Sequence, residues 1–274
     1  MRPVNRSLML VLAVVMAAPL PLNGQEGSKR PLTLDDYGTW SRITQVVLSP
    51  DGAWMAYAQQ PNEGDATFFV KELDGGTTHE ATNGSGAVFS DDGRWVAYLT
   101  APPEDEADKL RQERQPVPST LHLIDLRSGE RTEEASVRSF MFSEGGRFLA
   151  VHRNRSDPDA DHQGSDLLLR DLSAGTVLSF GNVSEFGFNE AGTHLAYLVD
   201  ADGKAGNGAY LVTAADGRIR ALSAGAETFA DLAWSETGEA LAVLRGEAPE
   251  GHTQRANRLV VVTETGSGSP QVIS

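Results

Sequence analysis

The sequence contains no cysteine, and this single absence excludes several kinds of chemistry. Without thiols, the chain forms no disulfide, offers no thiolate to a metal ion, and has neither a cysteine nucleophile nor a cysteine that carries a lipid. Basic residues are also scarce, since 23 lysines and arginines stand against 38 aspartates and glutamates, for a formal net charge of −15. An acidic surface repels phosphate backbones, so we expect no nucleic-acid partner.

Long hydrophobic runs are missing as well, with one short exception near the N-terminus. The run LMLVLAVVMAA, residues 8–18, follows two arginines and precedes prolines and small residues. Eleven apolar residues are too few for a membrane-spanning helix, which needs about 20, and the pattern is typical of an export signal. We therefore expect a signal peptide over residues 1–24, a periplasmic or extracellular location, and no membrane contact after cleavage. A retained membrane anchor is the alternative.

The motifs of familiar catalytic and ligand sites are absent too. The sequence has no G-x-S-x-G nucleophile elbow, no glycine-rich phosphate loop followed by lysine, and no H-E-x-x-H pair. Asp157, Asp159 and Asp161 alternate as in a calcium loop, but His162 replaces the glycine of position six and Leu168 the glutamate of position twelve. We therefore expect no catalytic residue, no cofactor and no metal ligand in this chain.

What the sequence has in abundance is one short pattern in five copies. LSPDGAWMAYA is followed by FSDDGRWVAYL, FSEGGRFLAVH, FNEAGTHLAYL and WSETGEALAVL. The turn glycines are Gly52, Gly93, Gly146, Gly192 and Gly238, spaced 41, 53, 46 and 46 residues apart. Glycine favours the positive φ of a tight hairpin turn, and strand-rich units that repeat every 40–50 residues or so are typical of propeller blades.

Each copy continues with a third strand and then a short fourth strand. The third strands are FFVKEL (68–73), LHLIDL (121–126), LLLRDL (167–172), AYLVTA (209–214) and RLVVVT (258–263). RIRALS (218–223) and PQVIS (270–274) are examples of the fourth. The second strands are apolar at consecutive positions, which indicates sheets covered on both faces. A ring of sheets packed face to face provides that cover, and the recurrent alanines, such as Ala56 and Ala97, suit close approach between sheets.

The pattern predicts an all-β protein, a β-propeller of four-stranded antiparallel blades. Five blades are visible over residues 44–274, after a lead-in segment over 25–43. The expected blades cover residues 44–82, 84–135, 137–180, 183–223 and 229–274. Five blades make either a small closed propeller or an incomplete part of a larger one. An open ring would leave two apolar sheet faces bare.

One charged segment departs from the repeat. Residues 101–119, APPEDEADKLRQERQPVPS, interrupt the second unit between its second and third strands. Glu104 to Gln115 can form a short solvated helix. We expect an exposed excursion without chemistry of its own, and a gate or partner contact at the rim of the ring is the alternative.

Several stretches resemble a known family. PLTLDDYGTWSRI (31–43), the first repeat that follows it, SDLLLRDLSAGTVLSFGNVSEFGFNEAGTHLAYLVDA (165–201) and LAWSETGEALAVLRG (232–246) resemble the N-terminal propeller of secreted bacterial prolyl oligopeptidase-type serine peptidases. In that family the propeller precedes an α/β-hydrolase domain, which carries the catalytic serine, aspartate and histidine. The propeller caps the active site and restricts access to small or unstructured peptides.

The resemblance implies a non-catalytic role for this chain. Its sequence has no segment of the hydrolase type, so none of the family's catalytic residues falls on a position here. We expect the gating propeller portion of an exported peptidase, truncated before the hydrolase domain, with that missing domain and peptide substrates as partners. The alternative is a stand-alone periplasmic propeller that binds a protein or a glycan.

Overall fold

The computed structural model of the chain describes residues 31–38, 40–247, 256–266 and 271–273. Within these residues the protein is mostly β, with nineteen strands in antiparallel sheets and one α-helix. The expected signal peptide lies outside the described residues. None of the described helices has the length and apolar character needed to cross a membrane.

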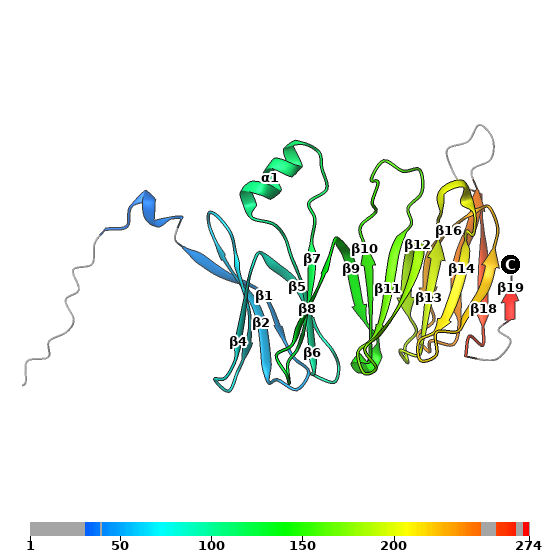
Figure 1. Cartoon of the computed structure of the whole chain (residues 1–274), viewed down its shortest axis with the longest axis horizontal. Helices are drawn as coiled ribbons and strands as arrows, with labels where there is room; N and C mark the ends of the chain where they lie inside the picture. Colours follow the sequence, from blue (N-terminus) through cyan, green and yellow to red (C-terminus); the bar gives the residue numbers. More distant parts are fainter. Residues whose placement is uncertain (1–30, 39, 248–255, 267–270, 274) are drawn as a thin grey trace, which may run out of the picture.

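The strands follow one another along the chain as antiparallel meanders (Figure 1). The first sheet contains β1 (Ser41–Leu48), β2 (Trp54–Pro61), β3 (Thr67–Glu72) and β4 (Thr78–Thr82). The second sheet contains β5 (Gly84–Phe89), β6 (Trp95–Thr100), β7 (Thr120–Asp125) and β8 (Arg131–Ala135). The last sheet contains β16 (Thr228–Trp234), β17 (Leu241–Glu247), β18 (Ala256–Thr263) and β19 (Gln271–Ile273). The helical segments are η1 (Leu34–Asp36), α1 (Glu104–Gln112), η2 (Glu144–Gly146) and η3 (Asp202–Lys204).

The third sheet has seven strands and departs from the expected pattern. It contains β9 (Val137–Phe142), β10 (Phe148–Arg153), β11 (Ser165–Asp171), β12 (Thr176–Phe188), β13 (His194–Val199), β14 (Gly208–Thr213) and β15 (Ile219–Ala224). The first part of β12 pairs with β11 and the last part pairs with β13, with irregular register around Val183. The expected blades 137–180 and 183–223 are therefore joined in one sheet, because β12 runs without a break from Thr176 to Phe188 and pairs with both β11 and β13, with Asn182 in a left-handed conformation (φ 57°) within it.

The sheets stand face to face in a row, and the first and last sheets lie at opposite ends of it (Figure 1). Four clusters of buried apolar side chains fill the spaces between neighbours. One joins the first and second sheets, the next joins the second sheet to β9–β11, a third lies between β9–β11 and β13–β15, and the fourth joins β13–β15 to the last sheet. The recurrent alanines Ala56, Ala97, Ala150 and Ala196 are fully buried in these spaces, as the close approach of the sheets requires.

The repeated turns also stack on one another, along the edge we call the turn edge. A side chain at Gly192 would place its Cβ 2.8 Å from the carbonyl oxygen of Glu144 in the preceding turn, and one at Gly238 would lie 2.9 Å from the amide nitrogen of Glu190. Both glycines have a positive φ, 64° and 67°. Glycine is therefore needed twice over, for the turn conformation and for contact between successive turns.

Candidate functional site

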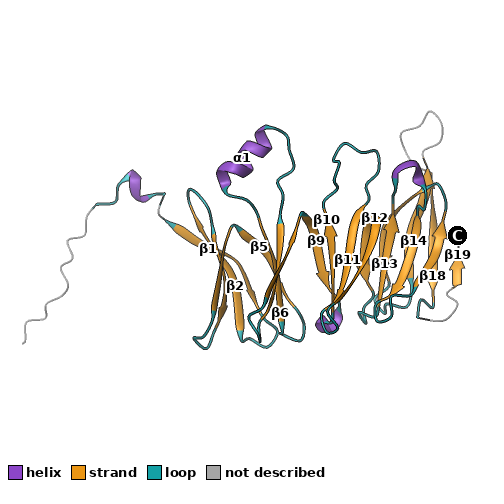
Figure 2. Cartoon of the chain, viewed as in Figure 1, coloured by secondary structure: helices purple, strands orange, loops and turns teal. Residues whose placement is uncertain are grey.

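The long connections project from the edge opposite the turn edge, which we call the loop edge. Figure 2 shows α1 and the connection between β10 and β11 on this same side of the row. The α1 connection spans residues 101–119, and the β10–β11 connection spans residues 154–164. The short helix expected from Glu104 is confirmed, although it ends at Gln112. The loop edge therefore carries the departures from the repeat.

The α1 connection is anchored at its base. The backbone N–H of Glu104 donates to Asp65 Oδ1 at 2.8 Å, and Asn83 Nδ2 donates to the same oxygen at 2.6 Å and to the Pro102 carbonyl at 3.1 Å. Ala107 is the buried residue of the helix. A hollow of about 190 Å³ lies beneath it, lined by Asn83 and Ala107 among others. These contacts tie the start of α1 to the first two sheets.

The β10–β11 connection is organised by one arginine. The Arg155 guanidinium donates to the carbonyl oxygens of Pro158, Ala160 and His162 at 2.8, 3.2 and 2.8 Å. Asp157 Oδ1 accepts the backbone N–H of Asp159 at 2.9 Å, so this carboxylate shapes the loop. Among the described residues, no group of three histidine, aspartate or glutamate side chains has the arrangement of a metal site.

A cavity of about 300 Å³ lies beside this connection. Its walls include Ser136, Arg153, Arg155, His162 and Asp166. Two nitrogen atoms on these walls, Arg153 Nε and His162 Nδ1, are shielded from solvent and have no hydrogen-bond partner among the described residues. Both cationic and carboxylate groups line the cavity, so it suits a polar ligand rather than an apolar one.

One serine–histidine contact lies next to the cavity. His152 Nε2 is 2.9 Å from Ser165 Oγ and 2.8 Å from the carbonyl oxygen of Val183, and Ser165 Oγ donates to the Arg153 carbonyl at 2.6 Å. A carbonyl oxygen only accepts, so Nε2 must carry the proton that it shares with Val183 and Ser165. A protonated Nε2 cannot take a proton from serine. This pair is therefore a structural bridge and not a nucleophile with its base.

Burial determines the charge state of His152. The side chain is 2% exposed, and its burial lowers its pKa, although the hydrogen bond with the Val183 backbone opposes the shift. The imidazole is therefore neutral near pH 7, with its proton on Nε2.

A second hydroxyl–imidazole–carboxylate row crosses the second sheet. His122 Nε2 is 2.9 Å from Thr100 Oγ1, its Nδ1 is 3.2 Å from Glu133 Oε1, and its ring stacks on Tyr98 at 5.1 Å. Burial lowers the pKa of His122, Glu133 raises it and Arg131 lowers it further. Nδ1 is not aligned for a hydrogen bond to Glu133. The imidazole therefore stays neutral near pH 7 and packs the sheet.

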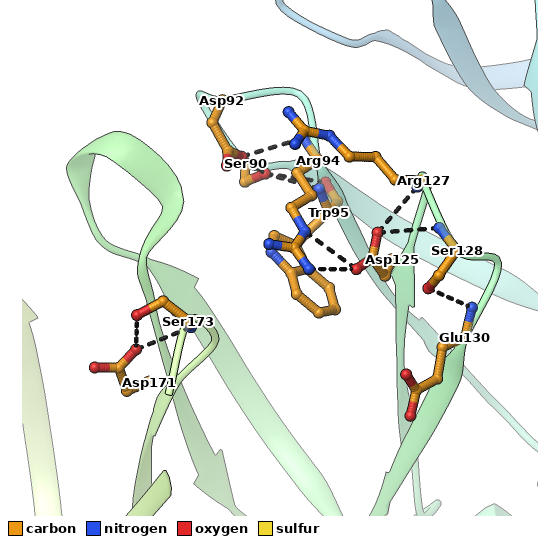
Figure 3. Close-up of polar contacts among 10 residues, drawn as sticks. All are labelled: Ser90, Asp92, Arg94, Trp95, Asp125, Arg127, Ser128, Glu130, Asp171 and Ser173. Atoms are coloured by element: carbon orange, nitrogen blue, oxygen red, sulfur yellow. Dashed lines mark hydrogen bonds and ion pairs between the residues drawn. The ribbon is translucent and has the colours of Figure 1, made fainter. Parts of the chain in front are cut away.

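Two arginine–aspartate pairs stabilise the turn edge, and Figure 3 shows the first of them, Arg94 with Asp125. Arg94 Nη2 and Arg147 Nη2 each lie 2.7 Å from a carboxylate oxygen, of Asp125 and Asp171 respectively. The Arg147 hydrogen bond is the largest cause that holds the pKa of Asp171 well below its usual range. Burial alone would raise the pKa of Asp125, but hydrogen bonds from Arg94 and two backbone amides outweigh it and lower the pKa.

These lowered pKa values have a structural cause. Asp125 Oδ1 accepts the backbone N–H groups of Arg127 and Ser128 at 2.9 and 3.4 Å, so the carboxylate also caps its own turn. Asp171 accepts the backbone N–H and hydroxyl of Ser173 at 2.9 and 2.6 Å in the same way. Such carboxylates are ionised anchors for turns, and we place no proton transfer there.

Comparisons with known proteins give a likeness of arrangement. No family model matches the chain, and no curated protein matches it. The β-propeller domain of the trilobed protease from Pyrococcus furiosus is 14% identical, with 86% of this chain and 72% of that chain covered and a TM-score of 0.47. A structure of prolyl endopeptidases is 16% identical, with 85% and 36% covered and a TM-score of 0.46.

An enzyme of another activity is similar to the same degree. Oligogalacturonate lyase in complex with manganese is 13% identical, with 84% of this chain and 64% of that chain covered and a TM-score of 0.48. Because these proteins differ in activity, the likeness assigns none to this chain. The chain spans about a third of the length of the prolyl endopeptidase structure.

Sequence reasoning missed both hydroxyl–imidazole rows and the cavity. Ser165 and His152 are 13 residues apart on different strands, and no motif joins them. Strand pairing offers the one usable signal, since His122 stands directly opposite Glu133 once β7 and β8 form a hairpin. The expectation that the chain holds no catalytic residue stays a prediction.

Proposed function

We propose that this chain is a five-bladed β-propeller region that gates access of peptides to a serine-peptidase domain of the prolyl oligopeptidase type, in an exported protein. In this proposal each half of the seven-stranded sheet is one blade, and β12 supplies the last strand of one and the first strand of the next. One observation carries the proposal: the two long connections project from the loop edge, each beside a hollow, and the serine–histidine contact next to them cannot act as nucleophile and base.

The α1 connection is the proposed gate. Its base is held by Asp65 and Asn83, and its acidic first turn and basic last turn suit a solvated helix. An arm that is fixed at the base and exposed along its length limits the size of molecules that reach a domain at this edge.

The experiment begins with the gene. We expect the reading frame to run on into a segment with G-x-S-x-G and later aspartate and histidine codons. In the extended protein, replacement of residues 103–117 by a short glycine–serine linker should raise kcat/KM for a long peptide and leave kcat/KM for a dipeptide amide unchanged. Equal changes for both substrates would contradict gating by this connection.

A second candidate function is a stand-alone binding module for a protein or glycan in the periplasm. It is favoured by the cavity beside the β10–β11 connection, with its unpartnered Arg153 Nε and His162 Nδ1. A stop codon directly after codon 274 would favour this alternative. Calorimetric titration with a peptide that has a free carboxyl terminus should then give binding that the peptide amide lacks and that His162→Leu weakens.

A further inference from the structure

The two ends of the row present opposite faces of the same repeated sheet. We call the outer side of the first sheet the front face, made of Ile43, Leu48, Met55, Tyr57 and Phe69. The outer side of the last sheet is the back face, made of Ala242, Leu244, Leu259, Val261 and Ile273. The register places the members of each set on one side, since Leu48 pairs with Met55, Tyr57 with Phe69, and Val261 with both Ala242 and Ile273.

The positions of the front face are covered wherever a sheet precedes them. Met55 corresponds to Val96, Leu149, Leu195 and Leu241, which are 0–1% exposed. The stacked pair Tyr57–Phe69 corresponds to Tyr98–His122 and to Tyr197–Tyr210. Tyr98 packs on Phe68 of the first sheet, with ring centroids 4.9 Å apart. Tyr57, the equivalent tyrosine of the first sheet, stacks on Phe69 of its own sheet, and no aromatic contact with another sheet occurs at this tyrosine among the described residues.

The positions of the back face are covered wherever a sheet follows them. Leu259 corresponds to Phe68, Leu121, Leu167 and Ala209, which are 0–2% exposed, whereas Leu259 itself is 56% exposed. Ala242 corresponds to the four fully buried alanines of the interior. Ile273 at the end of this face is 62% exposed. In the described part of the chain, large apolar side chains are thus exposed at both ends of the row.

The packing between neighbouring sheets inside the row shows which surface fits the front face and which fits the back face. At all four interior junctions, a back-type face of one layer packs on a front-type face of the next. We propose that the back face of one copy of this chain packs on the front face of a second copy, head to tail. Lys71 and Glu80 flank the apolar centre of the front face, as in an interface with a polar rim. This proposal stands apart from the proposed function.

The head-to-tail geometry makes a specific prediction about mixtures. A heterologous contact uses two different surfaces, so each copy can make two contacts and form a ring or a longer chain. A copy with a substitution in the front face keeps an unaltered back face, and a copy with a substitution in the back face keeps an unaltered front face. A mixture of the two variants should therefore form one junction, between the unaltered back face of one and the unaltered front face of the other. Each variant by itself should form none.

The test uses Leu48→Lys on the front face and Leu259→Lys on the back face of the full chain. These residues are 57% and 56% exposed, and Ile219→Lys, at a 53% exposed residue outside both faces, is the matched control. Sedimentation velocity over roughly 1–100 µM should show concentration-dependent association of the unaltered chain and the control. Each face variant should be monomeric, because a buried lysine without a partner is strongly unfavourable. An equimolar mixture of the two should give dimers and nothing larger.

Three results would overturn the proposal. The unaltered chain could stay monomeric over the whole range, the face variants could associate as the control does, or their mixture could remain monomeric. Circular dichroism melting checks that each variant is folded, and Leu48→Gln with Leu259→Gln replaces the pair if a lysine variant is not. The glutamine pair carries the same expected outcomes.

Discussion

Replacement of Gly192 by alanine tests the stacking of the repeated turns. Its φ of 64° is a left-handed conformation, which costs alanine about 1 kcal/mol. The new Cβ would also lie 2.8 Å from the Glu144 carbonyl oxygen, and relief of such crowding against backbone costs roughly 1–3 kcal/mol. We therefore expect Gly192→Ala to lower the free energy of unfolding by about 2–4 kcal/mol.

Gly175→Ala is the matched control. Gly175 has a φ of 70° and open space where a Cβ would stand, so its substitution should cost only the conformational part, about 1 kcal/mol. Urea unfolding followed by circular dichroism gives both values. Equal losses for the two variants would refute the stacking of the Gly192 turn on the Glu144 turn.

Three further predictions concern the core, the turn edge and pH. Leu195→Ala, at a fully buried residue, should cost about 2–5 kcal/mol in urea unfolding, whereas Ile219→Ala, at an exposed one, should cost less than about 0.5 kcal/mol. Asp171→Ala should lower the melting temperature more than Arg147→Met, because Asp171 also caps its turn through Ser173; an equal loss would contradict that role. Burial lowers the pKa of four histidines, so the folded state resists their protonation. The contribution of these neutral histidines to the free energy of unfolding is complete above 6.5, the pKa of histidine in the unfolded chain. It is lost as the pH falls through the lower pKa values that the histidines have in the folded state. The melting temperature should therefore decline below pH 6.5, ahead of the loss from aspartates, whose folded pKa values lie below 3.8; a flat profile down to pH 4 would contradict this.

The sequence predicted the strands and turns because their causes are local. Glycine at the turns and consecutive apolar residues in the second strands placed β2, β6, β10, β13 and β17 correctly. The helix from Glu104 was also visible in its charge pattern. It ends at Gln112, just before Arg114, whose φ is 56°, and residue type alone did not indicate this stop.

The remaining features depend on contacts between distant residues. Gly181-Asn182 reads as a break between strands, but Asn182 adopts a positive φ within β12 and the two expected blades share that strand. β1 begins at Ser41, inside the expected lead-in segment. The contact of His152 with Ser165 depends on the register of β10 and β11 and on a carbonyl of β12. No local pattern in the sequence encodes such a meeting of three strands.

The central proposal is that this row of sheets controls the access of peptides to a peptidase domain and does not hydrolyse peptides itself. The most direct measurement is hydrolysis of a fluorogenic prolyl peptide by the purified full chain, with mass spectrometry after treatment with a fluorophosphonate. We predict no turnover above the buffer rate and no covalent adduct, for the unaltered chain and for Ser165→Ala alike. Turnover that Ser165→Ala abolishes, or an adduct on Ser165, would contradict the account.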